Sequence, residues 1–442
     1  MDSSPPPRPR LAGGLGGVAA PSSRLSWFAV GGLLLTSFVV CLSATRSELV
    51  LPSSLRPLPS WLAGPFQGAG FELGLGALIA AFVVMFVCYA VAARTAHRLS
   101  ARAVLICILA LHAIVLFSPP LFSSDVFSYT AYARIGTIYG ANPYLHGPSA
   151  FPMEALHPLI GAQWVGTPTV YGPLFTGLSY LLVPFGIAAN VLAYKAVAAA
   201  SSLVLIVVIW RAARLRGLDS VKAAALVGLN PVIVLYGVGG GHNDLLMLAI
   251  LVAGLYVLLQ QRERSSGALL VTATAVKLTA GLLLPFALAA RRPRGDAAAA
   301  RRGLVVGACL GATAIVALAY VFFGTGPLHL LATLQGIQAE GGEHSIAGFL
   351  FTAVGLPGLA HPASLVLTVV FAAIVAWLLR RVWIGELDWI TGAGWATVAL
   401  LCTTGFLVPW YVAWLIPLAA LSSDRRLLAA TLFLTAVGLT TL

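Results

Sequence analysis

Apolar stretches long enough to cross a lipid bilayer recur from one end of this chain to the other. A transmembrane helix needs about 20 consecutive, mostly apolar residues, and hydrophobic residues fill 59% of the 442 positions whereas charged residues fill only 9%. Because lipid offers no hydrogen bonds, the backbone polar groups of such stretches must pair within helices. The sequence therefore predicts an all-α, polytopic transmembrane helix bundle with roughly 11–14 membrane segments, some of them re-entrant or broken.

Basic residues gather between the apolar stretches, and their placement predicts the orientation of the chain. Short loops rich in Lys and Arg stay on the cytoplasmic side of a membrane, and most of the 26 Lys and Arg residues lie in such clusters. This accounts for the net charge of +12 without a nucleic-acid partner. We expect a disordered, Pro- and Gly-rich cytoplasmic N-terminus over residues 1–25 and a single transmembrane domain over residues 26–442, a multi-pass protein of the cell membrane.

With the N-terminus inside, the basic clusters define a set of expected membrane spans. They lie near residues 26–44, 71–93, 103–120, 191–210, 223–239, 243–260, 303–324, 363–381, 389–407, 409–422 and 427–442. Three further apolar segments, at 172–187, 266–290 and 346–358, must then return to the side of the membrane from which they entered. We expect them to be hairpins, half-helices or interfacial pieces that line a cavity. Outer loops are expected near residues 45–70, 118–171 and 325–345.

Asp125 and Asp244 are the acidic residues whose positions best suit acid or base chemistry. Each stands at the membrane end of an apolar segment, where desolvation and neighbouring groups can tune a carboxylate. Asp125 also opens a segment in which Tyr129, Tyr132 and Tyr139 recur at helical spacing. The pattern predicts an interfacial helix with a stripe of tyrosines and with Arg134 near its far end. The alternatives are a helix-capping role for Asp125 and a membrane-anchoring role for the tyrosines.

A run of three glycines ends one expected span, and the next span begins beside His242, Asn243 and Asp244. A flexible turn into a helix N-terminus presents free backbone N–H groups and a positive dipole end, which suits a phosphate. No Gly-Lys-Ser/Thr sequence follows, so a nucleotide P-loop is excluded. The simpler alternative for His242 is a structural role, in which its ring is hydrogen-bonded at a helix end and takes no part in function.

Lys277 lies in the middle of an apolar segment. A lysine at that depth cannot easily reach the interface, so it needs an acidic group or a phosphate as its partner, and a broken helix would expose it to the cavity. The alternative is a buried structural ion pair. Trp410 and Tyr411 stand at the outer junction of two spans, where such rings either stack on a sugar or belong to the aromatic belt of the membrane.

Five stretches of the chain, in order over roughly residues 118–420, resemble the GT-C glycosyltransferases, and among them the polyprenyl-phosphate-mannose-dependent α-1,6-mannosyltransferases of bacterial lipomannan assembly. They are SSDVFSYTAYARIGTIYGANPY, TPTVYGPLF, LNPVIVLYGVGGGHNDLLM, AVKLTAGLLLPFAL and VPWYVAWLIPLAAL. The resemblance implies transfer of a sugar from a lipid phosphate to a hydroxyl on the outer face, with an acid of an early outer loop, here Asp125, as the base. Many GT-C proteins carry that acid just after the first span, whereas two further apolar segments precede it here.

These residues and the resemblance lead to one hypothesis about the site: an inverting hexosyltransferase on the extracytoplasmic face, moving mannose from a polyprenyl-phosphate donor to a glycolipid or glycan acceptor, with Asp125 as general base. The expected donor-phosphate ligands are His242, Asn243, Lys277 and Arg134. The expected sugar or acceptor ligands are Asp244, Tyr129, Asn142, Tyr171, Trp410 and Tyr411. No metal or other cofactor is expected, because no acidic pair is spaced to hold a metal. The alternatives are a transporter or flippase of a lipid-linked or anionic substrate, and a non-catalytic membrane scaffold.

Overall fold

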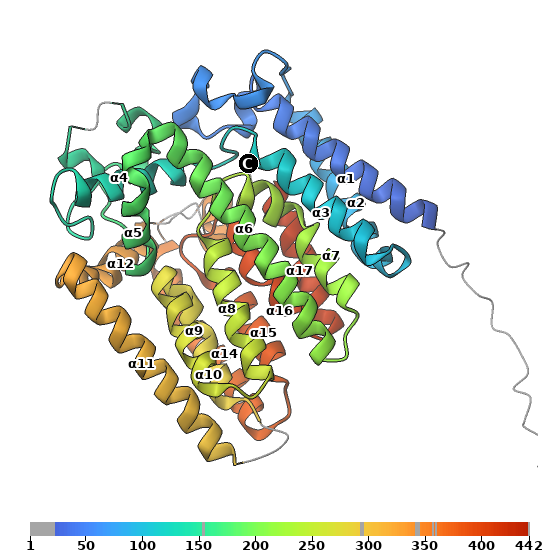
Figure 1. Ribbon diagram of the computed structural model, residues 1–442, viewed down its shortest axis with the longest axis vertical. Coiled ribbons are helices and arrows are strands. Elements are labelled where there is room, and N and C mark those ends of the chain that lie inside the picture. Colours follow the sequence, from blue (N-terminus) through green and yellow to red (C-terminus); the bar gives the residue numbers. More distant parts are fainter. Residues whose placement is uncertain are drawn as a thin grey trace, which may run out of the picture.

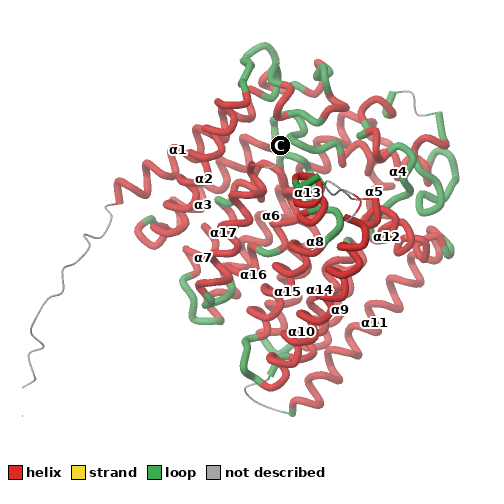
Figure 2. Tube along the Cα trace, turned by 180° about the vertical axis from the view of Figure 1, so that it is seen from behind, coloured by secondary structure: helices red, strands yellow, loops and turns green. Residues whose placement is uncertain are grey.

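The computed structural model describes residues 23–152, 155–291, 296–340, 345–355, 358 and 360–440. Over these residues the chain forms seventeen α-helices, α1–α17, joined by turns and loops, and no strand (Figures 1 and 2). The predicted all-α bundle is therefore confirmed. The N-terminus expected to be disordered falls, up to residue 22, outside the described residues.

Within the described residues, five helical segments are long and apolar enough to cross a membrane. They correspond to all or most of α1 (Ser23–Ser43), α2 (Leu75–Thr95), α5 with α6 (Pro173–Ser179 and Gly186–Leu215), α11 (Ala297–Phe323) and α14 (Ala360–Ile384). A bent pair, α7 (Ser220–Gly228) with a π-helix (Val232–Val238), makes a possible sixth. The count of 11–14 membrane segments stays a prediction, since it depends on how many shorter apolar helices also cross.

The remaining helices are shorter and fill the space between these spans. They are α3 (Ala101–Leu116), α4 (Asp125–Thr137), α8 (Asp244–Leu259), α9 (Glu263–Val276), α10 (Leu283–Ala289), α12 (Leu330–Glu340), α13 (Ile346–Ala353), α15 (Trp389–Thr403), α16 (Ile416–Ala420) and α17 (Arg425–Thr440). One continuous cluster of buried apolar side chains runs through the bundle and includes both Ala29 and Leu439.

Two helix breaks bear on the site. The expected single span at 223–239 is instead bent by 46°, because Pro231 has no N–H to continue the helix and the Asn230 side chain accepts from the Val232 N–H at 2.9 Å. The segment 266–290 is interrupted at Lys277, whose backbone is extended (φ −151°, ψ 125°) between the end of α9 and a 3₁₀ turn that leads into α10. The predicted broken helix is therefore present there.

One expectation about the outer segments is wrong. The tyrosines of α4 do not form an exposed, interfacial stripe, because most side chains of the helix are buried and Tyr129 and Tyr132 are only 1% and 2% exposed. The segment expected as an outer loop at 325–345 contains helix α12, and its side of the membrane stays a prediction. Tyrosine spacing predicted the helix at α4 but could not show that other segments cover it on every side.

Helices α8, α9 and α11 pack together in the order α8, α9, α11. α8 and α9 lie side by side, joined by a short turn at Gln261, whose φ is +61°. α11 packs on α9 and runs along the edge of the bundle (Figure 1). That packing is close because of Gly307, where an added Cβ would lie 1.9 Å from the Arg264 carbonyl oxygen.

Candidate active site

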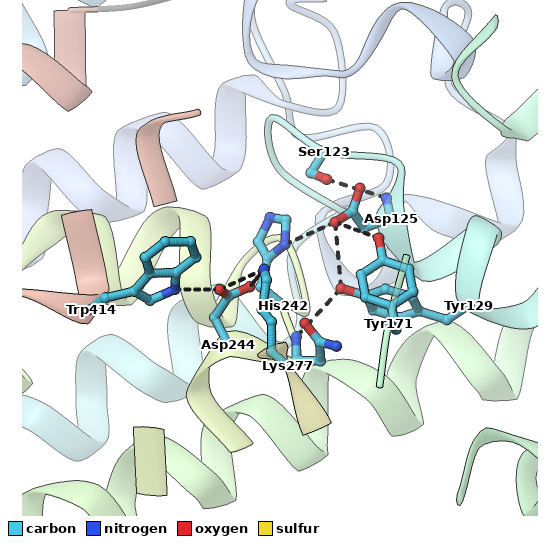
Figure 3. A network of polar contacts seen from close by, with 9 residues as sticks. Ser123, Asp125, Tyr129, Tyr171, His242, Asp244, Lys277 and Trp414 are labelled. Atoms are coloured by element: carbon cyan, nitrogen blue, oxygen red, sulfur yellow. Dashed lines mark hydrogen bonds and ion pairs between the residues drawn. The ribbon is translucent and has the colours of Figure 1, made fainter. Parts of the chain in front are cut away.

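Asp125, at the start of α4, lies at the centre of a buried polar cluster (Figure 3). The hydroxyls of Tyr129 and Tyr171 donate to its Oδ2 at 3.4 and 3.2 Å. The Nδ1 atom of His242 lies 3.2 Å from the same oxygen. The Asp125 backbone N–H donates to the Ser123 hydroxyl at 3.2 Å. Local sequence places the serine and the first tyrosine, whereas Tyr171 and His242 come from distant segments.

The surroundings of Asp125 keep its carboxyl ionised. Burial alone raises its pKa, but the His242 ring beside it, the positive charge of Lys277 and the Ser123 hydroxyl together bring the pKa below the ordinary value of 3.8. Burial and the Asp125 charge hold the pKa of Tyr129 and of Tyr171 well above the usual range. Both phenols therefore keep their protons at neutral pH and serve as donors to the carboxylate.

His242 occupies the turn between the π-helix and α8. The preceding Gly241 has φ +69°, a backbone conformation that favours glycine. The imidazole is fully buried, with 0% exposure, and stacks on the Trp410 ring at a centroid distance of 4.1 Å. Its Nε2 atom has no hydrogen-bond partner in the part of the chain that the structure describes. The ring is thus held by packing rather than by a second hydrogen bond.

Asn243 continues this turn. Its backbone N–H donates to the Tyr129 hydroxyl at 3.4 Å, which links the turn to the Asp125 cluster. Its side chain is buried, and within the described residues both the Oδ1 and the Nδ2 atom lack a partner. A buried carboxamide without partners carries a free-energy cost that a hydroxyl-bearing ligand would remove.

Asp244 and Lys277 form an ion pair beside the Asp125 cluster (Figure 3). The Lys277 ammonium lies 2.7 and 2.9 Å from the two Asp244 carboxylate oxygens. Trp414 Nε1 donates to Asp244 Oδ1 at 2.6 Å. The ammonium also lies 4.9 Å from the centre of the Tyr411 ring, within cation–π range. The sequence left an acidic group or a phosphate open as the partner of Lys277, and in the structure Asp244 is an acidic partner, as the alternative of a buried ion pair also expected.

Two of the expected ligands lie outside the cluster. Arg134 follows Asp125 by nine residues in one helix, which places it about 13 Å further along the axis and on the opposite face. Asn142 is engaged elsewhere, since its Nδ2 donates to the Phe323 carbonyl at 2.6 Å and its Oδ1 accepts from the Tyr144 N–H at 3.0 Å. Asn142 therefore ties its loop to the end of α11.

Sequence reasoning missed Trp414 and Lys195. Trp414 reads as an ordinary aromatic residue in an apolar run, and nothing local reveals its bond to Asp244. Lys195 lies in α6 and is 1% exposed, and its ammonium donates to the Ser118 carbonyl and, at 3.3 Å, to the Pro119 carbonyl. The position of Lys195 inside an apolar stretch could have identified it as a functional or structural lysine, as the same feature identified Lys277.

No group of three His, Cys, Asp or Glu side chains within the described ranges is arranged to hold a metal ion. The polar chemistry of this region comes instead from one carboxylate with phenol and imidazole neighbours, and from one carboxylate–ammonium pair. Both sit within an apolar helix bundle. The fold and the cluster together define a polytopic helical membrane protein with a polar internal site.

Residues 29–292 match a family model described as alpha-(1->6)-mannopyranosyltransferase, N-terminal domain, and residues 342–442 match one described as MptB C-terminal domain. The chain belongs to this alpha-(1->6)-mannopyranosyltransferase family. It is 30% identical to alpha-(1->6)-mannopyranosyltransferase A of Mycobacterium tuberculosis, over 72% of this chain and 64% of that protein. It is 28% identical to alpha-(1->6)-mannopyranosyltransferase B of Corynebacterium glutamicum, over 69% of this chain and 56% of that protein. The chain thus spans less than two thirds of the length of these relatives.

Proposed function

We propose that this protein is a membrane mannosyltransferase that moves mannose from a polyprenyl-phosphate donor to a hydroxyl of a lipid-linked glycan acceptor. Membership of a family whose named relatives are alpha-(1->6)-mannopyranosyltransferases supports the transferred sugar. The single observation that carries the proposal is the position of the Asp125 carboxylate, which is partly buried, lies 3.2 Å from His242 and is beside the Asp244–Lys277 pair.

Asp125 is the proposed general base. A direct displacement at the anomeric carbon forms one bond from the acceptor oxygen, breaks the bond to the donor phosphate, and inverts the configuration. The acceptor hydroxyl must lose its proton as the new bond forms, and a positioned carboxylate can take it. The two phenols that donate to Asp125 fix its orientation, while one side of the carboxyl stays accessible, with 14% of the side chain exposed.

Lys277 is the proposed partner of the departing phosphate. An ammonium has three N–H donors, and Asp244 accepts two of them. The third is left for a phosphate oxygen, and 12% of the side chain is exposed. The carboxamide of Asn243, which has no partner among the described residues, is suited to sugar hydroxyls, since it offers both a donor and an acceptor. Arg134 takes no part in this arrangement.

The proposed site opens on the extracytoplasmic face. Asp244 begins α8 and Lys277 follows α9, whereas the other ends of these two helices meet at a turn that carries Arg262 and Arg264. Basic turns remain on the cytoplasmic side. The Asp244–Lys277 end therefore faces outward in the orientation that the basic loops favour.

The decisive experiment supplies purified protein in liposomes with radiolabelled polyprenyl-phosphate mannose and glycolipid acceptors. We expect a new mannosyl linkage with wild-type protein and none with Asp125→Asn at equal expression. Glu48→Gln is the matched control, because Glu48 is an exposed acid of the outer segment after α1. Turnover by Asp125→Asn would remove Asp125 as the base, and movement of the labelled lipid without a new glycosidic bond would identify a flippase instead.

A further inference from the structure

A cavity of about 490 Å³ lies at the far ends of α8 and α9 from the Asp244–Lys277 pair. Helix α8 has 16 residues, so its length separates the cavity from Asp244 by about 24 Å. The walls come from the turn into α9 and from the first half of α11. The lining residues are Gln261, Arg262, Glu263, Arg264, Ser265, Ala299, Arg302, Gly303 and Val306.

Glycines on α11 bring the two walls of this cavity together. At Gly307 an added Cβ would lie 1.9 Å from the Arg264 carbonyl oxygen, and at Gly303 it would lie 3.2 Å from the Glu263 Cβ. Small residues at such positions let two membrane helices approach closely. The close crossing places Arg302, at the start of α11, on the same cavity as Arg262 and Arg264 from the start of α9.

The cavity is rich in groups that bind anions. Arg262, Arg264 and Arg302 line it together with one acidic residue, Glu263, so its lining side chains carry a net positive charge. Among the described residues, none of the three arginines forms a salt bridge. Helix α9 begins here without a side-chain cap, since Arg262 at the N-cap position makes no capping hydrogen bond. Guanidinium forks and uncapped helix N–H groups both favour phosphate oxygens.

Apolar surface continues from the cavity along α11. Val306 lines the cavity and is 38% exposed, and Leu310, one turn further on, is 66% exposed. Only 17% of the apolar window of α11 is buried inside the protein, so this face meets lipid. A ligand that fits both parts has a phosphate at one end and hydrocarbon at the other.

We propose that this cavity binds the headgroup phosphate of an anionic phospholipid whose acyl chain lies along Val306 and Leu310 of α11. The basic pocket then holds a structural lipid at the membrane face opposite the candidate active site. This site is independent of the proposed transferase activity. It stands on the cavity, its three arginines and the apolar track that leads away from it.

Retention of phosphatidylglycerol by the purified full-length protein tests this proposal. The protein is incubated with equal amounts of phosphatidylglycerol and phosphatidylcholine in detergent, washed, and examined by native mass spectrometry. We expect phosphatidylglycerol to be retained preferentially, and Arg264→Gln/Arg302→Gln to lower its retention about tenfold or more. The control is Arg425→Gln/Arg426→Gln, which removes two exposed arginines from the start of α17, where Asp424 already accepts from backbone N–H groups. It should retain the lipid within about twofold of wild type.

A second variant and a competitor complete the test. Val306→Trp keeps every charge but fills the cavity, and it should also lower retention, which serves as the readout if the double arginine variant does not fold. Equal retention by wild type and by folded cavity variants overturns the proposal. Displacement of the lipid by glycerol phosphate at equal concentration also overturns it, because the site then recognises a free anion and not a lipid.

Discussion

The Oδ2 atom of Asp125 and the Nδ1 atom of His242 lie 3.2 Å apart, although one residue opens α4 and the other precedes α8. The Asn243 N–H, which donates to the Tyr129 hydroxyl, joins the same two segments a second time. Asp244, the next residue, carries the ion pair with Lys277. Three consecutive residues of one turn therefore connect the carboxylate cluster to the carboxylate–ammonium pair.

The pH dependence of transfer should report the influence of His242 on Asp125. The folded pKa of Asp125 lies below its ordinary value, so its ionised form stabilises the fold at neutral pH and this stability is lost as the pH falls through the folded pKa. The acid limb of kcat/KM due to Asp125 should lie below about pH 4. In His242→Gln, Asp125 is still buried but has lost the imidazole that lowers its pKa. The acid limb should therefore move to higher pH by about one unit or more.

Rate profiles from about pH 2 to about pH 8 cover the acid limb of both proteins and measure this shift. His97→Gln is the control, because His97 is exposed at the end of α2, and its profile should match that of wild type. An unchanged acid limb in His242→Gln would show that the imidazole does not set the pKa of Asp125.

The Asp244–Lys277 pair should show strong coupling in a double-mutant cycle. Removing one partner leaves the other charge buried, which costs about 3–5 kcal/mol, because these side chains are only 2% and 12% exposed. Lys277→Met and Asp244→Asn should each destabilise by that amount, and the double variant by much less than their sum. Unfolding by denaturant in mixed micelles gives the free energies.

The exposed pair of Arg381 and Glu386, at 3.2 Å, provides the comparison for this cycle. Its side chains are 34% and 57% exposed, and a surface pair of this kind contributes about 0–1 kcal/mol. Additive effects at Asp244 and Lys277, or equal coupling in both pairs, would contradict a buried ion pair.

Lys195→Met should destabilise the protein by about 1–3 kcal/mol. The substitution keeps the apolar stem but leaves the buried carbonyls of Ser118 and Pro119 without their donor. Thermal unfolding in detergent measures the effect. Lys222→Met, at an exposed lysine in α7, should change the midpoint little, and an equally small effect at Lys195 would mean that water replaces the ammonium.

Gly307→Ala should weaken the packing of α11 on α9 by about 1–3 kcal/mol. The new methyl group would lie 1.9 Å from the Arg264 carbonyl oxygen, so the two helices must separate. Gly31→Ala is the matched control in α1, because no heavy atom lies within 4 Å of an added Cβ there. Alanine favours a helix over glycine by about 1 kcal/mol, so the control should be neutral or more stable, and the same result at Gly307 would argue against a close crossing.

Much of the fold follows from local composition. The apolar stretches predicted helices that the structure contains, and the break at Lys277 was predicted from the depth of one charge in an apolar segment. Asp125, His242 and Lys277 were singled out because a polar group in an apolar chain needs a partner, which is a property of each residue and its neighbours in sequence. Their roles in catalysis stay predictions until the variants are measured.

The partners themselves were decided by tertiary structure. Composition showed that Lys277 needs an anion, yet only the packing of α9 beside α8 selects Asp244, and only the fold of the 409–414 turn adds Trp414. The contact of Asn142 with the Phe323 carbonyl likewise depends on where α11 lies. Arg134, in contrast, lies on the far face of α4 because of helix periodicity alone, nine residues after Asp125. Local composition was enough to predict lipid-embedded helices, because the free energy of transferring a segment into lipid is the sum of the contributions of its own residues. Which polar groups meet inside the bundle depends on how distant helices cross, because hydrogen bonds and ion pairs form only between atoms that the whole fold brings within about 3 Å of each other.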